Sequence, residues 1–156
     1  MTVYTSQQFQ EPIPTNTTAG GEIVFRAYWS PSSNTTLADN DIIRMARLPA
    51  GYAITDIVLD TAACGTSCEG CVGILDSVDS PTAVSSVVIA TGSLATAAIK
   101  RTDTVGSTGY AVSTSEQAVG VEITTSSGTN IAANAKMALI IRARPKQKVE
   151  QSQDAS

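Results

Sequence analysis

The stretch Asp41–Asp60, DIIRMARLPAGYAITDIVLD, gives the clearest indication of the fold. It contains two apolar runs, 42–48 and 53–59, separated by the tetrapeptide Pro-Ala-Gly-Tyr. Aliphatic and β-branched residues dominate both runs, and a Pro/Gly pair between such runs is typical of two strands joined by a tight connection. We therefore expect a β-hairpin here.

The second run carries apolar residues on both faces of the predicted strand. Ile57 and Leu59 share one face, while Ile54 and Val58 share the other face with Asp56. Apolar residues on both faces predict burial on both sides. We expect one face to pack inside a sandwich and the other to contact a neighbouring subunit, which makes Ile54 and Val58 predicted interface residues.

Alternation of apolar and polar residues predicts further short strands on either side of this stretch. They cover Glu22–Trp29, Cys71–Asp76, Val84–Ala90, Val119–Thr124 and Met137–Arg144, with another around Tyr110–Val112. Ser93–Lys100 is the best helix candidate, because Ser93 can cap a segment with three alanines. Seven or eight strands with frequent turn signals predict an all-β fold, an antiparallel β-sandwich or jelly-roll-like domain with at most one short helix.

A chain of 156 residues is the size of one ordinary domain. We expect an extended N-terminal arm over 1–21, a β-sandwich over 22–144 and a polar tail over 145–156. Prolines at 12 and 14 argue against a helix in the arm. Tyr4, Phe9 and Ile13 are its predicted anchors on a partner, so removal of residues 1–18 should leave a folded domain that no longer attaches.

The composition excludes several classes of function. A net charge of −4 and a pI near 4.6 argue against nucleic-acid binding, which normally requires a basic patch. No apolar run reaches the roughly 18 residues of a membrane helix, and the first 21 residues lack the apolar core of a signal peptide. We therefore expect no membrane partner and synthesis in a cytoplasm.

Three cysteines, Cys64, Cys68 and Cys71, form the one motif with chemical character. Their C-x3-C-x2-C spacing also occurs around iron–sulfur clusters, but the helix–strand alternation of those enzymes is missing. A zinc site would need a fourth ligand from a chain that contains no histidine. A structural role, a local or intersubunit disulfide and a metal site all stay open, and the structural role is favoured; we expect no cofactor.

The sequence contains no recognisable catalytic motif. Without histidine there is no ready base for a nucleophile, and no phosphate-binding or nucleophile-elbow motif occurs. Paired carboxylates among Asp56, Asp60, Asp76 and Asp79 are better explained as strand-surface and turn residues. Trp29 could stack a sugar but is more simply a core residue. We expect no enzyme activity and no catalytic residue.

Two segments together, Ala38–Thr61 followed by CVGILD and Val119–Arg144, resemble small structural proteins of tailed bacteriophages. The matching positions are Asp41, Ile43, Leu48, Pro49, Gly51, Asp56 and Leu59, and the resemblance covers roughly half of the chain. The cysteine loop departs from this pattern.

The resemblance implies a virion component of the capsid decoration or cement type. Such a protein would bind the outer capsid surface, bridge subunits of the major capsid protein, and associate with itself, commonly as a homotrimer. The alternatives are another virion component, such as a tail-tube, neck or head-fibre protein, and a surface module that binds a host or a glycan.

Overall fold

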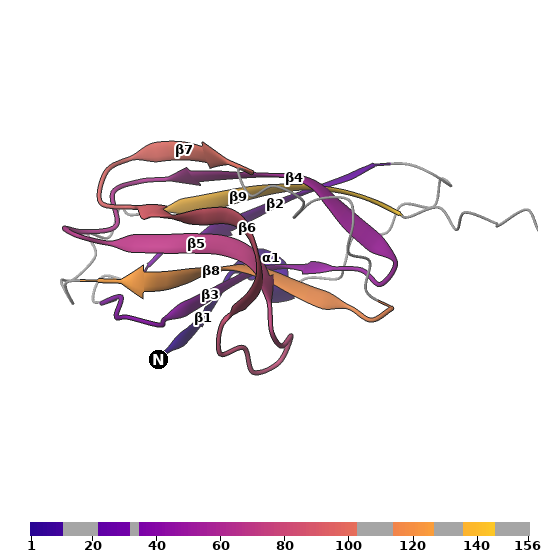
Figure 1. Cartoon of the computed structure of the whole chain (residues 1–156), viewed down its shortest axis with the longest axis horizontal. Coiled ribbons are helices and arrows are strands. Elements are labelled where there is room, and N and C mark those ends of the chain that lie inside the picture. The colour runs from indigo at the N-terminus through magenta and orange to yellow at the C-terminus, as the bar shows by residue number, and fades with distance from the viewer. Residues whose placement is uncertain (11–21, 32–34, 103–113, 127–135, 146–156) are drawn as a thin grey trace, which may run out of the picture.

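The computed structural model describes residues 1–10, 22–31, 35–102, 114–126 and 136–145. In these segments nearly all regular structure is β-strand, arranged as two facing sheets (Figure 1). The strands are β1 (Val3–Thr5), β2 (Ile23–Trp29), β3 (Ile42–Leu48), β4 (Tyr52–Thr61), β5 (Glu69–Leu75), β6 (Val84–Ser93), β7 (Ala98–Arg101), β8 (Gln117–Thr125) and β9 (Met137–Pro145), with one helix, α1 (Gln7–Gln10). The predicted all-β sandwich with at most one short helix is confirmed.

One sheet has the strand order β1-β3-β8-β5-β6 and the other β2-β9-β4-β7. All pairings are antiparallel except that of β1 with β3, which is parallel. No helix in the described segments is long and apolar enough to cross a membrane.

The main core lies between the two sheets and is built from aliphatic side chains. β2 is the clearest example of this arrangement. Buried and exposed residues alternate strictly along the strand, and the inward side chains are Ile23, Phe25, Ala27 and Trp29. The inner residues of β8 and β9 alternate in the same way. The faces predicted for these three strands are confirmed.

The predicted hairpin over Asp41–Asp60 is wrong, although both of its strands exist. β3 belongs to the five-stranded sheet and β4 to the four-stranded sheet, so the two strands are not hydrogen-bonded partners. The connection is a corner between layers: Tyr52 donates its backbone N–H to the Pro49 carbonyl at 3.3 Å, and Gly51 adopts a φ of +80°. A Pro-Ala-Gly turn is compatible with a hairpin and with a corner between two sheets. Here β3 pairs with β8 and β4 pairs with β9, so the turn forms a corner.

The two faces predicted for β4 are also partly wrong. The register with β9 shifts between Ile54 and Asp56, so Thr55 has no partner and the alternation changes phase there. Ile54 therefore points into the same core as Ile57 and Leu59. Val58 stays on the outer face and is half-buried.

The helix predicted over Ser93–Lys100 is not formed. Ser93 ends β6, and Ala98–Arg101 is β7, which pairs with β4. Pairing with an existing sheet edge outweighs the weak helical preference of a short alanine-rich segment. The strand predicted around Tyr110–Val112 lies outside the described residues.

The one helix lies instead in the predicted arm, directly after β1. Its four residues precede the two prolines, which therefore do not interrupt it. β1 extends the five-stranded sheet beside β3, and α1 contacts both β2 and β3. Residues 1–10 are thus part of the folded domain of their own chain.

Candidate interaction surface

The two sheets differ in how their outer faces are covered. The outer face of the five-stranded sheet carries a second apolar cluster, in which Phe9 packs against Ile42, Leu75 and Ala118. Phe9 is only 3% exposed. The N-terminal helix thus covers much of this face with the protein's own side chains.

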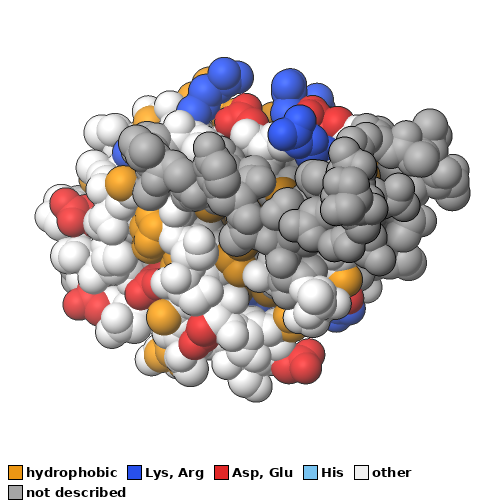
Figure 2. Space-filling model, turned by 45° about the vertical axis from the view of Figure 1, so that its right-hand side comes forward, with side chains coloured by type: hydrophobic (Ala, Val, Ile, Leu, Met, Phe, Trp, Pro, Cys, Tyr) orange, Lys and Arg blue, Asp and Glu red, His pale blue; other side chains and the backbone are white. Residues whose placement is uncertain are grey.

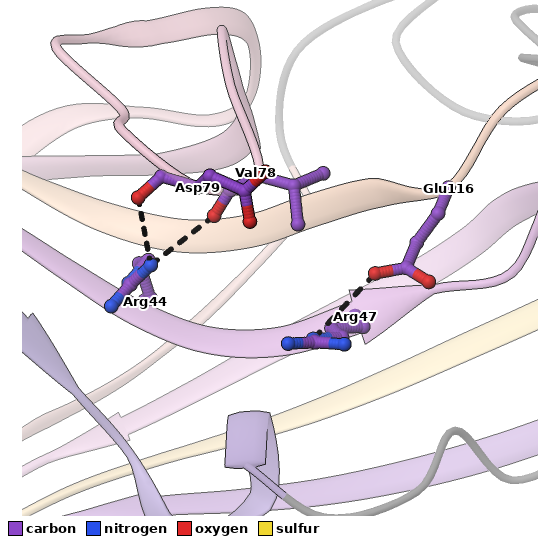
Figure 3. Close-up of polar contacts among 5 residues, drawn as sticks. All are labelled: Arg44, Arg47, Val78, Asp79 and Glu116. Carbon is purple, nitrogen blue, oxygen red and sulfur yellow. Dashed lines mark hydrogen bonds and ion pairs between the residues drawn. The ribbon is translucent and has the colours of Figure 1, made fainter.

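Two arginines of β3 hold this cover in place. The guanidinium carbons of Arg44 and Arg47 lie 4.8 and 4.9 Å from the centroid of the Phe9 ring, where cation–π attraction is effective. Arg44 also donates to the carbonyls of Val78 and Asp79, at 3.3 and 3.1 Å, and so ties down the loop after β5 (Figure 3).

Arg44 and Arg47 each make a further contact to another part of the chain. Arg44 donates to the Thr5 hydroxyl at 2.8 Å, and Arg47 pairs with Glu116 at 3.5 Å (Figure 3). The arginine side chains are therefore committed to holding the N-terminal segment, the loop after β5 and the start of β8 together.

The outer face of the four-stranded sheet lacks such a cover among the described residues. We call it the four-strand face. It bears exposed or half-buried apolar residues together with charged ones: Val24, Tyr28, Val58, Ile99, Ala138 and Ile140, with Arg26, Arg101, Arg142, Arg144, Asp56, Asp60 and Glu22. Three of the apolar side chains are strongly exposed: Val24 at 51%, Tyr28 at 61% and Ile99 at 71%.

Strand register arranges these residues in rows across the sheet. One row runs from Arg26 through Ile140 and Val58 to Arg101, so two apolar residues lie between two guanidinium groups. The next row runs from Tyr28 through Ala138 and Asp60 to Ile99. Large exposed apolar groups beside arginine are typical of interaction surfaces.

The charge of this face is opposite to that of the chain. It holds four arginines against Asp56, Asp60 and Glu22, a balance of +1, whereas the whole chain has a net charge of −4. Within the described segments the one ion pair is that of Arg47 with Glu116. On the four-strand face Arg142 lies opposite Asp56 in the strand register, whereas Arg26 and Arg101 lie opposite the apolar residues Ile140 and Val58. Figure 2 shows Lys and Arg side chains at the top of the view, with Asp and Glu side chains among them.

A shallow recess lies at one edge of this face. It has a volume of about 230 Å³ and is lined by Gln7 and Gln8 of α1 and by Arg26 and Tyr28 of β2. A guanidinium, a phenol and two carboxamides therefore line one depression. Such groups bind carboxylates and other oxygen-rich groups by hydrogen bonding.

The predicted interface residues are distributed over both surfaces and the core. Tyr4 is half-buried, lies edge-on to Trp29 with 5.6 Å between ring centroids, and donates its hydroxyl to the Thr36 carbonyl. Phe9 is buried in its own chain, Ile54 lies in the core, and Val58 lies on the four-strand face. Ile13 lies outside the described residues.

All three cysteines are buried free thiols. Burial is the main cause that raises the pKa of each thiol, and the pKa of Cys68 reaches about 11. The Cys64 sulfur lies 3.3 Å from the Thr61 hydroxyl oxygen. No group of three His, Cys, Asp or Glu side chains in the described segments is placed to hold a metal ion.

The four aspartates considered as catalytic carboxylates are not brought together. Asp56 and Asp60 lie on β4, whereas Asp76 follows β5 in the other sheet. Asp76 accepts hydrogen bonds from the Thr82 hydroxyl and backbone amide, which lower the pKa of its carboxyl group. It therefore acts as a turn residue. Trp29, the candidate sugar-stacking residue, lies in the core.

Comparison with known proteins adds a structural likeness. No protein-family model matches the chain, and no curated protein matches it either. The solved structure of the capsid of Ralstonia phage GP4 contains a chain with a TM-score of 0.76 and 18% identity; the match covers 92% of this chain and 98% of that chain. This protein has the fold of a phage capsid chain.

A second likeness, to a chain of the cyanophage Pam1 capsid asymmetric unit, has a TM-score of 0.55 and 17% identity. It covers 89% of this chain and 95% of that chain. Since the match spans almost the whole of both chains, the shared feature is the complete domain and not a single sheet.

Val58 is the one residue of the four-strand face that was predicted from the sequence as an interface residue. Arg26 and Tyr28 belong to a predicted strand whose outward face received no interface role, although Tyr28 beside Trp29 could have stacked a sugar, and Ile99 fell within the predicted helix Ser93–Lys100. One sequence feature could have indicated this surface. Val24 and Tyr28 are two large apolar residues on the outward side of a strand whose inward side is already apolar.

Proposed function

We propose that this chain is a non-enzymatic structural protein of a phage virion, and more specifically a capsid cement or decoration protein. The observation that carries the proposal is the shared fold with a chain of the Ralstonia phage GP4 capsid, which extends over nearly the full length of both chains. The sequence outline over Ala38–Thr61 and Val119–Arg144 supports the same assignment.

In this role the chain would bind the outer capsid surface and bridge subunits of the major capsid protein. A protein that binds only the assembled lattice stabilises it by mass action, because its binding free energy is lost when the lattice comes apart. A rigid β-domain with an uncovered apolar and basic face suits such a task. Self-association as a trimer and synthesis in the host cytoplasm belong to the same proposal.

The test uses capsid shells of the source phage that were assembled without this chain. The purified protein is added, unbound protein is removed by sedimentation, and occupancy is measured by quantitative gel analysis and electron microscopy. We expect saturable binding at ordered positions on the outer surface and shells that resist heating to a higher temperature. A protein that remains unbound, or that is found only in purified tails, would refute the cement role.

A further inference from the structure

Two features of the four-strand face, and a contrast with the other sheet, indicate that it binds a partner. Its exposed side chains include a tyrosine and four arginines, residue types that are enriched at the energetic centres of protein interfaces. Tyr28 lies opposite Ala138 and Val58 lies opposite Ile140, so these four apolar residues are neighbours on the sheet, while Ile99 lies opposite Asp60 and Val24 opposite Arg142. The opposite sheet, in contrast, covers its outer apolar cluster with Phe9 of the same chain.

From these features we infer that the four-strand face docks onto an acidic and apolar protein surface of the capsid lattice, and that the recess at Arg26 and Tyr28 receives a carboxylate side chain. This inference rests on the proposed cement function. It goes further by assigning the contact face and the chemistry of the surface that the face recognises.

Charge complementarity decides the character of the partner. The chain has a net charge of −4 but places four arginines against three acidic residues on this face, so it repels acidic proteins in general and attracts them at that face. Arg26 has no ionic partner in the described segments, and its guanidinium is planar and can bind a carboxylate with two parallel hydrogen bonds. An acidic side chain therefore fits the recess better than a basic one.

The size of the face is that of a single contact, to which a capsid lattice could add others. Four strands spaced about 4.8 Å apart and seven residues long span a projected area of roughly 450 Å². A standard interface buries about 800 Å² of accessible surface on each partner, and accessible surface is a larger measure than projected area, so this face is the size of one modest contact. On a capsid, additional contacts to neighbouring subunits would add to it.

The test compares charge reversals on the four-strand face with a reversal on the inward side of β7. Arg101 points outward on the four-strand face, whereas the adjacent Lys100 extends toward Gly92 on β6 of the other sheet. The variant pair R26E/R101E changes the face, and K100E is the matched control for a charge reversal on β7. Y28A tests the aromatic side of the recess, and thermal unfolding verifies that all variants are folded.

Each protein is added to capsid shells assembled without this chain, at about 0.1 M and 0.5 M salt. We expect R26E/R101E and Y28A to lose about tenfold or more in affinity, K100E to bind like the wild type, and wild-type binding to weaken at high salt.

Two outcomes would overturn the inference and leave the cement role intact. In the first, wild type and face variants bind the shells equally. In the second, the face variants bind normally but lose a self-association that is visible by light scattering, which would place a second copy on this face. Absence of binding by the wild type would instead refute the proposed function itself.

Discussion

The backbone amide of Thr2 donates a hydrogen bond to the buried carboxylate of Asp41, with 2.5 Å between the Thr2 nitrogen and Asp41 Oδ1. The second oxygen of the same carboxylate accepts the backbone N–H of Ala38 at 2.8 Å. One side chain thus fixes both the start of β1 and the loop before β3. The parallel pairing of β1 with β3 starts beside this contact.

Replacement of Asp41 by Asn should destabilise the domain. An Asn side chain has one acceptor oxygen in place of two, so one of the two amides loses its partner in a buried position. We expect the free energy of unfolding to fall by about 1–3 kcal/mol. Urea denaturation measures this, with D60N as the control at an exposed position of β4, where the change should stay within about 0.5 kcal/mol. Equal stabilities of D41N and D60N would contradict the assigned role.

Phe9 should contribute more to stability than any exposed residue of the N-terminal segment. Phe9→Ala removes a buried ring that lies between two guanidinium groups and leaves a cavity over Ile42 and Leu75, so we expect a loss of about 3–5 kcal/mol. Gln10→Ala, at an exposed position of the same helix, is the matched control and should have little effect. Chemical denaturation followed by circular dichroism gives both values.

The same packing changes the expected result of an N-terminal deletion. Sequence reasoning predicts that a chain without residues 1–18 stays folded and only loses attachment. The structure predicts instead that removing residues 1–10 deletes an edge strand and uncovers an apolar cluster, so the shortened chain should unfold at a lower denaturant concentration. An unchanged unfolding midpoint would show that the segment is an independent arm after all.

Two glycines should respond differently to substitution by alanine. A Cβ atom at Gly120 of β8 would lie 2.5 Å from the Ile43 carbonyl oxygen and 3.0 Å from a Leu75 methyl group, so the strands would have to move apart. At Gly51 the added Cβ meets no atom within 4 Å, and only the positive φ is costly. We expect G120A to cost about 3 kcal/mol and G51A about 1 kcal/mol. The reverse order in thermal or urea denaturation would contradict this structure.

Alkaline pH should weaken the fold through Cys68. Burial raises the pKa of its thiol from an ordinary value of 9.0 to about 11 in the folded protein. Between pH 9 and about 11 the unfolded chain releases this proton while the folded chain keeps it, so stability falls as the pH rises. Cys68→Ala should show a smaller fall across this interval. Denaturation at pH 8, 9.5 and 11 measures the effect, and identical slopes for both proteins would exclude it.

The burial of the three free cysteines also predicts how fast a thiol reagent modifies them. Because burial keeps the three thiols protonated and covered, a thiol reagent at pH 8 should modify them slowly in the folded protein and rapidly in denaturant. Mass spectrometry counts the modified sites. Fast labelling of the native protein would show that the cysteine loop opens readily.

Local sequence determined those features that depend on the period of two residues along a strand. The inward side of β2 from Ile23 to Trp29 follows from strict alternation, as do the inward sides of β8 and β9. An all-β fold followed from many short alternating runs with polar turns between them. Each of these statements depends on side-chain direction within one strand, which the backbone geometry of a strand imposes.

Tertiary structure alone decided which strands became partners and which surface remained uncovered. The turn at Pro49–Gly51 permits a hairpin or a corner between sheets, and only the competing partners β8 and β9 select the corner. The shift at Thr55 moves Ile54 from the outer face into the core, because register is set between strands and not within one. Likewise Phe9, a plausible anchor on a neighbour by sequence, fills its own chain's cluster, while Tyr28 remains exposed on the four-strand face.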